Sequence, residues 1–228
     1  MISGELFSRI KNKLNPESKK ESFSKHILMI QKIAPLSYQI MGEAFFKTTL
    51  PSYFREVPIN LENPLESILY FPLYLKKFSS DHKAPEYVIE LMDYEYVKYQ
   101  LQSDESTTSL VPYSQTTTEI YLNPIAQAIR HEYDVHGFVC TLNKGWSKKV
   151  LPKKSRTLLL VSKSPTSKDL TFLKGNIYHA AIIDQLQDGK MLKKNLLMAL
   201  HTDHPNVPQS EWIVALKSLK EIYFTLEA

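Results

Sequence analysis

Residues 34–78 read APLSYQIMGEAFFKTTLPSYFREVPINLENPLESILYFPLYLKKF, and this stretch decides the fold class of the N-terminal half. Aromatic and aliphatic side chains recur through it at helical spacing, while prolines and one glycine punctuate it. Pro35 suits the first turn of a short helix, and Gly42 suits the cap at its end. A longer helix over residues 43–56 follows, in which Pro51 is expected to cause a kink or a break. The stretch therefore predicts packed helices and contains no catalytic motif.

The same helical spacing extends to both sides of this stretch. Residues 5–14 and 22–33 each place apolar side chains on one face, and a long helix is expected over residues 85–102. The apolar face of that long helix includes Val88, Leu91, Met92, Glu95 and Tyr99.

Glu95 is the charged member of this apolar face. A buried carboxylate needs a partner, so Glu95 is expected in a structural ion pair, at an interface or as a general base. Because no second acid accompanies it, the structural and interface roles are favoured. Glu95 and Tyr99 are therefore our candidates for contact with a partner protein.

The bulk composition of the 228 residues narrows the class of protein. A hydrophobic content of 43% is enough for a real core and excludes global disorder. No apolar run approaches the ~18 residues of a membrane span, and the N-terminal residues lack the apolar core of a signal peptide. The single cysteine, Cys140, suits a reducing compartment. We expect a cytoplasmic protein that does not enter the membrane.

Residues 103–118, SDESTTSLVPYSQTTT, are rich in serine and threonine and poor in apolar residues. Such a composition is typical of a linker or a long loop. It predicts a helical domain over residues 1–117, with the linker at its end, and a second domain over residues 118–228.

The second domain shows a different pattern, in which short apolar runs precede amphipathic segments. Strands are expected over residues 134–142, 156–162 and 168–174, with a last strand at 221–226; helices are expected over residues 125–133, 177–187, 191–201 and from 209 onward. Three strands followed by three helices describe both a winged helix and a precursor-recognition domain. The whole chain is thus predicted to be α+β, with an all-helical N-terminal domain and a winged-helix-like or precursor-recognition-like β3α3 domain.

The charge of the chain is uneven. Residues 1–117 carry 13 basic and 14 acidic side chains, whereas residues 118–228 carry 15 and 10. Seven basic residues and no acid lie between residues 143 and 163, which describes either an anion-binding loop or a solvated one. If the second domain bound DNA, the phosphate contacts would come from Lys148, Lys149, Lys153, Lys154, Lys193 and Lys194. The helix over residues 191–201 offers few side chains that read base edges.

Two sequence features could indicate a nucleophile or a metal site, but neither is favoured as functional. Cys140 could pair with His136 or His131 as a nucleophile, but a buried structural cysteine on a strand is favoured. The run from His201 to His204 offers two imidazoles and a carboxylate without further metal ligands. No glycine-rich phosphate loop is present. We expect no catalytic residues, no metal site and no cofactor in this chain.

Four phrases along the chain, in order, are typical of one protein family. The first holds Pro35, Met41, Gly42, Glu43, Phe45 or Phe46, Tyr53 and Pro58; the second holds Tyr87, Glu90, Leu91 and Glu95; the third holds Asn123, Pro124, Ile129, Arg130, Tyr133 and Val135; the fourth holds Trp212, Leu216, Ile222 and Phe224. In these phrases the chain resembles the HvfC- and BufC-type DNA-binding-domain family, whose members are partner proteins of multinuclear iron-dependent oxidases. The chain is also similar to the methanobactin-biosynthesis partner protein, which belongs to this group.

The resemblance implies a non-catalytic subunit that binds such an oxidase and a ribosomally made precursor peptide. The iron would belong to the oxidase. The leader of the precursor would add as a strand beside residues 168–174, close to the last helix. The candidate peptide-binding residues are Asp169, Thr171, Leu173, Trp212 and Leu216, and Phe172 is expected in the core. The alternative function is a DNA-binding transcriptional regulator.

The predicted domain boundary can be tested by limited proteolysis. Brief digestion is expected to cut first within residues 103–118, because few apolar side chains anchor that segment. Mass spectrometry of the fragments gives the position. A first cut inside residues 43–77 would contradict the boundary.

Overall fold

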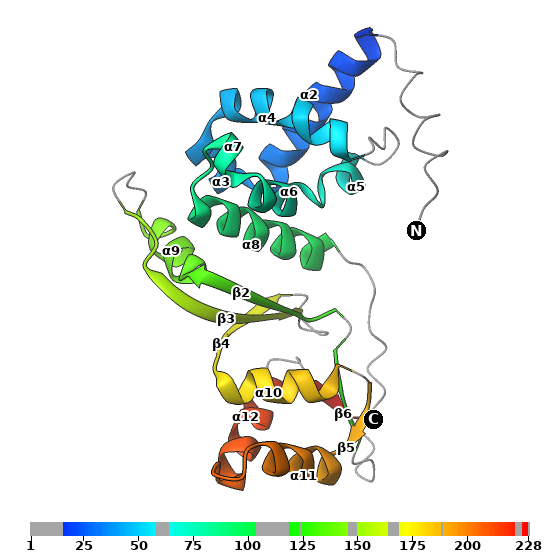
Figure 1. Cartoon of the computed structure of the whole chain (residues 1–228), viewed down its shortest axis with the longest axis vertical. Helices are drawn as coiled ribbons and strands as arrows, with labels where there is room; N and C mark the ends of the chain where they lie inside the picture. Colours follow the sequence, from blue (N-terminus) through cyan, green and yellow to red (C-terminus); the bar gives the residue numbers. More distant parts are fainter. Residues whose placement is uncertain are drawn as a thin grey trace. The chain divides into compact units, whose positions relative to one another are not determined.

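The computed structural model describes residues 16–57, 64–103, 119–123, 125–145, 150–163, 169–187, 189–221 and 225–227. The chain is an α+β protein that divides into two compact units, residues 1–96 and 97–228 (Figure 1). The division lies within a helix, α8, before the predicted linker. Residues 104–118 of that linker and the predicted helix over residues 5–14 lie outside the described residues, so both remain predictions.

Every element in the described part of the first unit is a helix, as the sequence predicts. The helices are α2 (Pro16–Ile33), α3 (Pro35–Met41), α4 (Glu43–Glu56), α5 (Pro64–Ile68), α6 (Phe71–Lys77), α7 (Ser79–His82) and α8 (Glu86–Ser103), the last of which continues into the second unit. Pro35 occupies the first turn of α3. Gly42 ends α3 with a φ of 78°, a conformation that costs a residue with a Cβ atom more than it costs glycine.

Helix α4 is continuous, so the expected break at Pro51 does not occur. Phe46, Leu50 and Tyr53 lie one turn apart on its buried face and hold the helix on both sides of the proline. The Tyr53 hydroxyl donates a 2.6 Å hydrogen bond to the Ser67 carbonyl oxygen, which ties α4 to α5. Tertiary packing thus compensates for the backbone hydrogen bond that Pro51 cannot donate.

The N–H groups at the start of helix α3 donate hydrogen bonds to a carboxylate that is distant in the sequence. Its N-cap residue, Ala34, has no side chain that could accept a backbone N–H. Glu95 of α8 accepts hydrogen bonds from the N–H groups of Leu36 (2.8 Å) and Ser37 (3.0 Å) and from the Ser37 hydroxyl (2.6 Å). Glu95 is buried as expected, and its negative charge is favourable at the positive end of a helix.

The second unit contains two small antiparallel sheets and the remaining helices. Its elements are β1 (Glu119–Leu122), β2 (Gln127–Tyr133), α9 (Val135–Leu142), β3 (Lys154–Lys163), β4 (Leu170–Gly175), α10 (Ile177–Leu186), β5 (Met191–Leu192), α11 (Lys193–Asp203), α12 (Gln209–Glu221) and β6 (Thr225–Glu227). One sheet has the order β2-β3-β4 and the other the order β5-β1-β6. The described part of the chain has no helix that is long and apolar enough to span a membrane.

The structure reverses two predicted elements. Residues 125–133 were expected as a helix but form strand β2, and residues 134–142 were expected as a strand but form helix α9. The Asn123 side chain accepts the N–H of Ile125, which makes a turn rather than a helix start. The order of elements in the structure therefore differs from the predicted β3α3 order, because α9 lies between the first two strands of the β2-β3-β4 sheet.

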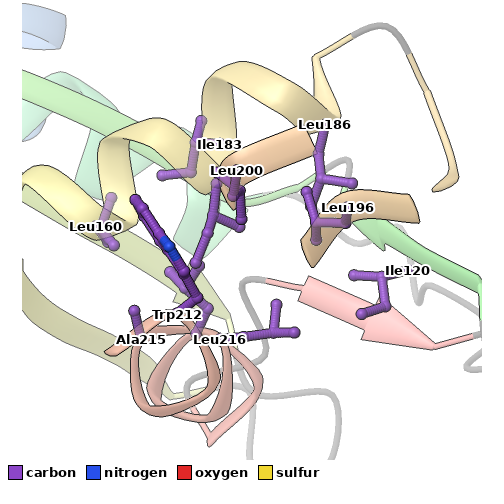
Figure 2. Packing of buried hydrophobic residues seen from close by; sticks show 11 residues of the cluster. Ile120, Leu160, Ile183, Leu186, Leu196, Leu200, Trp212, Ala215 and Leu216 are labelled. Atoms are coloured by element: carbon purple, nitrogen blue, oxygen red, sulfur yellow. The ribbon is translucent and has the colours of Figure 1, made fainter. Parts of the chain in front are cut away.

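The core of the second unit lies where α10, α11 and α12 meet strands of both sheets. Its buried members are Ile120, Leu160, Ile182, Ile183, Leu186, Leu196, Leu200, Trp212, Ala215, Leu216 and Leu219. Figure 2 shows the Trp212 ring among these side chains. Burial of so large a side chain contributes about 2–3 kcal/mol, so Trp212 fixes how α12 packs on α10.

The contribution of Glu95 to stability can be measured directly. Replacing it with Ala leaves two N–H groups of α3 without their acceptor, so the free energy of unfolding is expected to fall by about 3 kcal/mol. Urea denaturation followed by circular dichroism measures this value. The control is Glu43→Ala, which breaks an exposed 2.6 Å ion pair with Lys47 and is expected to cost less than about 1 kcal/mol. Equal losses in the two variants would contradict the role of Glu95.

Candidate functional site

Strand β4 forms one edge of the β2-β3-β4 sheet. It pairs along one side with β3, from Leu158 opposite Gly175 to Lys163 opposite Leu170. Among the described residues no strand pairs with its other side. The backbone of an edge strand presents hydrogen-bonding groups that another extended chain can use. We therefore take the outer side of β4 as the candidate site.

The two faces of β4 pack against different helices. Leu173 packs against the core formed by α10, α11 and α12. Phe172, on the opposite face, stacks on the His136 ring of α9 with ring centroids 4.8 Å apart. The sequence-based expectation had Phe172 on the core side and Leu173 toward a guest. The two faces of β4 are therefore the reverse of the expectation, because α9 covers the face that carries Phe172.

The end of β4 is tied to α9 by an ion pair. The Lys174 ammonium lies 2.7 Å from the Asp134 carboxylate, which also caps α9 by accepting the Gly137 N–H at 3.1 Å. The hydrogen bond from Lys174 is the main reason that the pKa of Asp134 lies below its usual value. A Cβ atom at residue 137 would lie 2.8 Å from the Asp134 carboxylate oxygen, so a larger residue there would displace this capping side chain. This contact holds the last residues of the edge in place.

Cys140 lies one turn after His136 on α9 and is exposed, which corrects the expectation of a buried cysteine on a strand. Its Sγ atom is 3.7 Å from His136 Nε2, and burial lowers the pKa of the imidazole. His201 and His204 are also exposed. Within the described ranges, no three His, Cys, Asp or Glu side chains gather as a metal site.

The predicted peptide-binding residues separate into two groups. Asp169 is exposed and Thr171 half-buried, so both lie within reach of a chain that adds to β4. The side chains of Trp212 and Leu216 belong to the core, so a guest cannot touch them without opening it, whereas Leu173 is partly buried and packs against that core. The predicted contact of the Trp212 and Leu216 side chains with a peptide is therefore wrong, and that of Leu173 stays a prediction.

Those predicted DNA-contacting lysines that the structure describes do not gather on one surface. Lys148 and Lys149 lie outside the described residues. Lys154 begins β3 and Lys153 precedes it. Figure 1 shows this end of the sheet far from α11, where Lys193 and Lys194 lie. Lys154 also packs over the Tyr133 ring, with 5.7 Å between its Nζ atom and the ring centroid.

The two residues predicted to contact a partner protein differ in their burial. Glu95 is buried and binds the start of α3, so the structural role explains its position. Tyr99 is half-buried on α8 and stays a candidate contact. Sequence reasoning missed the contribution of α9 to the site, although Asp134 followed by helical apolar spacing could have revealed it.

Comparison with known proteins adds no family assignment. The chain matches no protein-family model, and no curated protein matches it. The resemblance described from the sequence therefore enters below as part of a proposal.

The start of α10, directly after β4, is held by a neutral histidine. Asn176 and His179 form a capping box in which His179 Nδ1 accepts the Asn176 N–H at 3.0 Å. Since Nδ1 accepts, Nε2 carries the proton and donates to the Ser218 hydroxyl of α12 at 2.7 Å. That hydroxyl in turn donates to the Ala215 carbonyl. Burial lowers the pKa of His179, so the folded state favours this neutral form.

This arrangement predicts a loss of stability in mild acid. In the unfolded chain His179 takes up a proton near pH 6.5, whereas the folded state resists it to a lower pH. The His179 contribution is therefore complete above about pH 6.5 and declines as the pH falls below that value.

Thermal melting curves recorded from about pH 7.5 to about pH 5, at intervals of about half a pH unit, measure this effect. His179→Gln keeps an acceptor for the Asn176 N–H but does not titrate, so it should flatten the dependence. His201→Gln, at an exposed position, is the control. An unchanged slope in His179→Gln would show that another group causes the loss.

Proposed function

We propose that this protein is a non-catalytic partner subunit that holds a peptide along β4. The peptide is the leader of a ribosomally made precursor, and the partner is a multinuclear iron-dependent oxidase that modifies the precursor. The observation that carries the proposal is the outer side of β4, an edge to which no described strand pairs. The resemblance to the HvfC- and BufC-type family supplies the identity of the peptide and of the oxidase.

The edge suits strand addition for physical reasons. Its two faces are fixed by Phe172 against His136 and by Leu173 in the core, so the edge does not have to be ordered when a guest binds. A rigid edge lowers the entropic cost of adding a strand. The net charge of +5 over residues 118–228 would steer an acidic leader toward this half. The iron and its redox chemistry would reside in the oxidase, while this chain contributes binding and positioning.

The topology also favours the alternative, a DNA-binding regulator. Helices α10, α11 and α12, with β5 between the first two and β6 after the third, resemble a winged helix in which β1 fills the centre of the sheet. In that arrangement α12 would enter the major groove. Its exposed positions include the polar or basic Gln209, Lys217 and Lys220 as well as Glu211, Ile213 and Val214. The adjacent exposed side chains of Ile213 and Val214 suit a protein or peptide partner better than a phosphate backbone.

A proline substitution in β4 tests strand addition. Along an antiparallel strand, the N–H groups of successive residues point to opposite sides. Of Leu170→Pro and Thr171→Pro, one therefore removes a bond to β3 and the other removes a donor from the outer side. The variant that keeps the wild-type melting temperature is the outer one. Calorimetry with a synthetic acidic, amphipathic leader peptide should show at least about a tenfold loss of affinity in that variant.

The same preparation separates the two functions. Co-purification with the oxidase and wild-type affinity for the leader support the proposal. Unchanged leader affinity in the folded outer variant would show that the peptide does not add at β4. Salt-dependent binding to random duplex DNA that exceeds leader binding would favour the regulator.

A further inference from the structure

Helix α11 borders a groove of about 780 Å³ that the functions above do not use. Leu192, Leu197 and Met198 supply much of its apolar wall, and Lys193, Lys194 and His201 carry its basic groups. Met198 is 59% exposed and Leu192 43% exposed, so both apolar side chains are accessible to a partner. In Figure 1 α10 lies between the β2-β3-β4 sheet and α11, so the groove is separate from the outer side of β4.

The start of α11 breaks two rules of helix stability. Its N-cap residue is Leu192, and no side chain accepts the first backbone N–H groups. Its first two residues, Lys193 and Lys194, place positive charge at the positive end of the helix, where it destabilises. Neither lysine forms an ion pair with a carboxylate in the described part of the chain. By contrast, the neighbouring Lys190 is paired with Glu119 at 2.7 Å.

Such a local conflict without internal compensation is typical of a functional surface. None of the described residues that line the groove is acidic. Carboxylates from outside would therefore meet two lysines and uncapped N–H groups at one end, and apolar side chains would meet Leu197 and Met198 one turn further along. Methionine adapts its shape to different apolar guests.

We propose that the α11 groove is a docking site for an acidic amphipathic segment of a partner protein. The segment carries carboxylates that face Lys193 and Lys194, and large apolar side chains about one helical turn away that cover Met198 and Leu197. This assignment rests on the groove and its charge, and it holds whether or not a leader adds at β4. DNA fits the groove less well, because its apolar wall offers nothing to phosphates.

The test uses the full-length protein and fluorescein-labelled synthetic helical peptides. The first peptide has paired glutamates one turn from paired leucines; the second has lysines in place of the glutamates; the third has serines in place of the leucines. Fluorescence anisotropy should show binding of the first peptide, and at least about tenfold weaker binding of the other two.

Charge reversal at the helix start then locates the site. The double variant Lys193→Glu/Lys194→Glu should bind the glutamate peptide at least about tenfold more weakly and should gain affinity for the lysine peptide. Acidic residues at a helix start are stabilising, so this variant is expected to fold at least as well as the wild type. Met198→Ala should weaken binding by about threefold to tenfold through lost apolar contact.

The matched control is Lys144→Glu/Lys153→Glu, which changes the net charge equally at two exposed positions far along the chain from α11. An equal loss of binding in this control would show non-specific attraction and overturn the proposal. Failure of the glutamate peptide to bind the wild type would overturn it as well. Full displacement of the peptide by random duplex DNA or by oleate would assign the groove to a phosphate backbone or a lipid instead.

Discussion

Glu95 brings a negative charge from α8 to the start of α3, where two backbone N–H groups and the Ser37 hydroxyl bind it. The fold of the first unit depends on this contact, because α3 has no cap of its own and its N–H groups would otherwise be buried without an acceptor. The second unit meets the same requirement locally: Asp134 caps α9, and Asn176 caps α10. Helix α11 is different, since no side chain caps it and two lysines begin it.

Much of the fold could be predicted from the sequence wherever the period of apolar residues and the end signals agree. The helical first unit, β3, β4, α10 and α12 follow from such patterns. The helix and the strand predicted over residues 125–142 are exchanged in the structure. The prediction failed there because the apolar period and the end signals disagreed. The buried face of β2 includes His131, which hid its alternation, and Asn123 resembles a helix cap but makes a turn. Helix α9 keeps its apolar residues at the spacing i, i+3, i+4 and i+7, which is the stronger signal.

The candidate site was only partly predictable for a related reason. The period of a strand says which side chains share a face, but it does not say which face meets which helix. Once α9 is known to be a helix, Phe172 has a partner in His136, and Leu173 is left for the core. Trp212 and Leu216 are large apolar residues of the kind that also serve in binding pockets, and only packing shows that they hold α12 in place. The position of the edge strand along the chain, in contrast, follows from the sequence.

Strand addition alone recognises a backbone, and every extended peptide offers one. Selectivity in such complexes comes from pockets for alternate side chains beside the edge. In this protein the side chains that flank the edge at its centre are committed internally, Phe172 to α9 and Leu173 to the core. A guest on β4 would therefore be distinguished mainly through Asp169, Thr171 and the general positive charge of the second unit. The α11 groove offers what the edge lacks: paired cations at a defined distance from apolar side chains, on a surface where the sequence of a partner can be read.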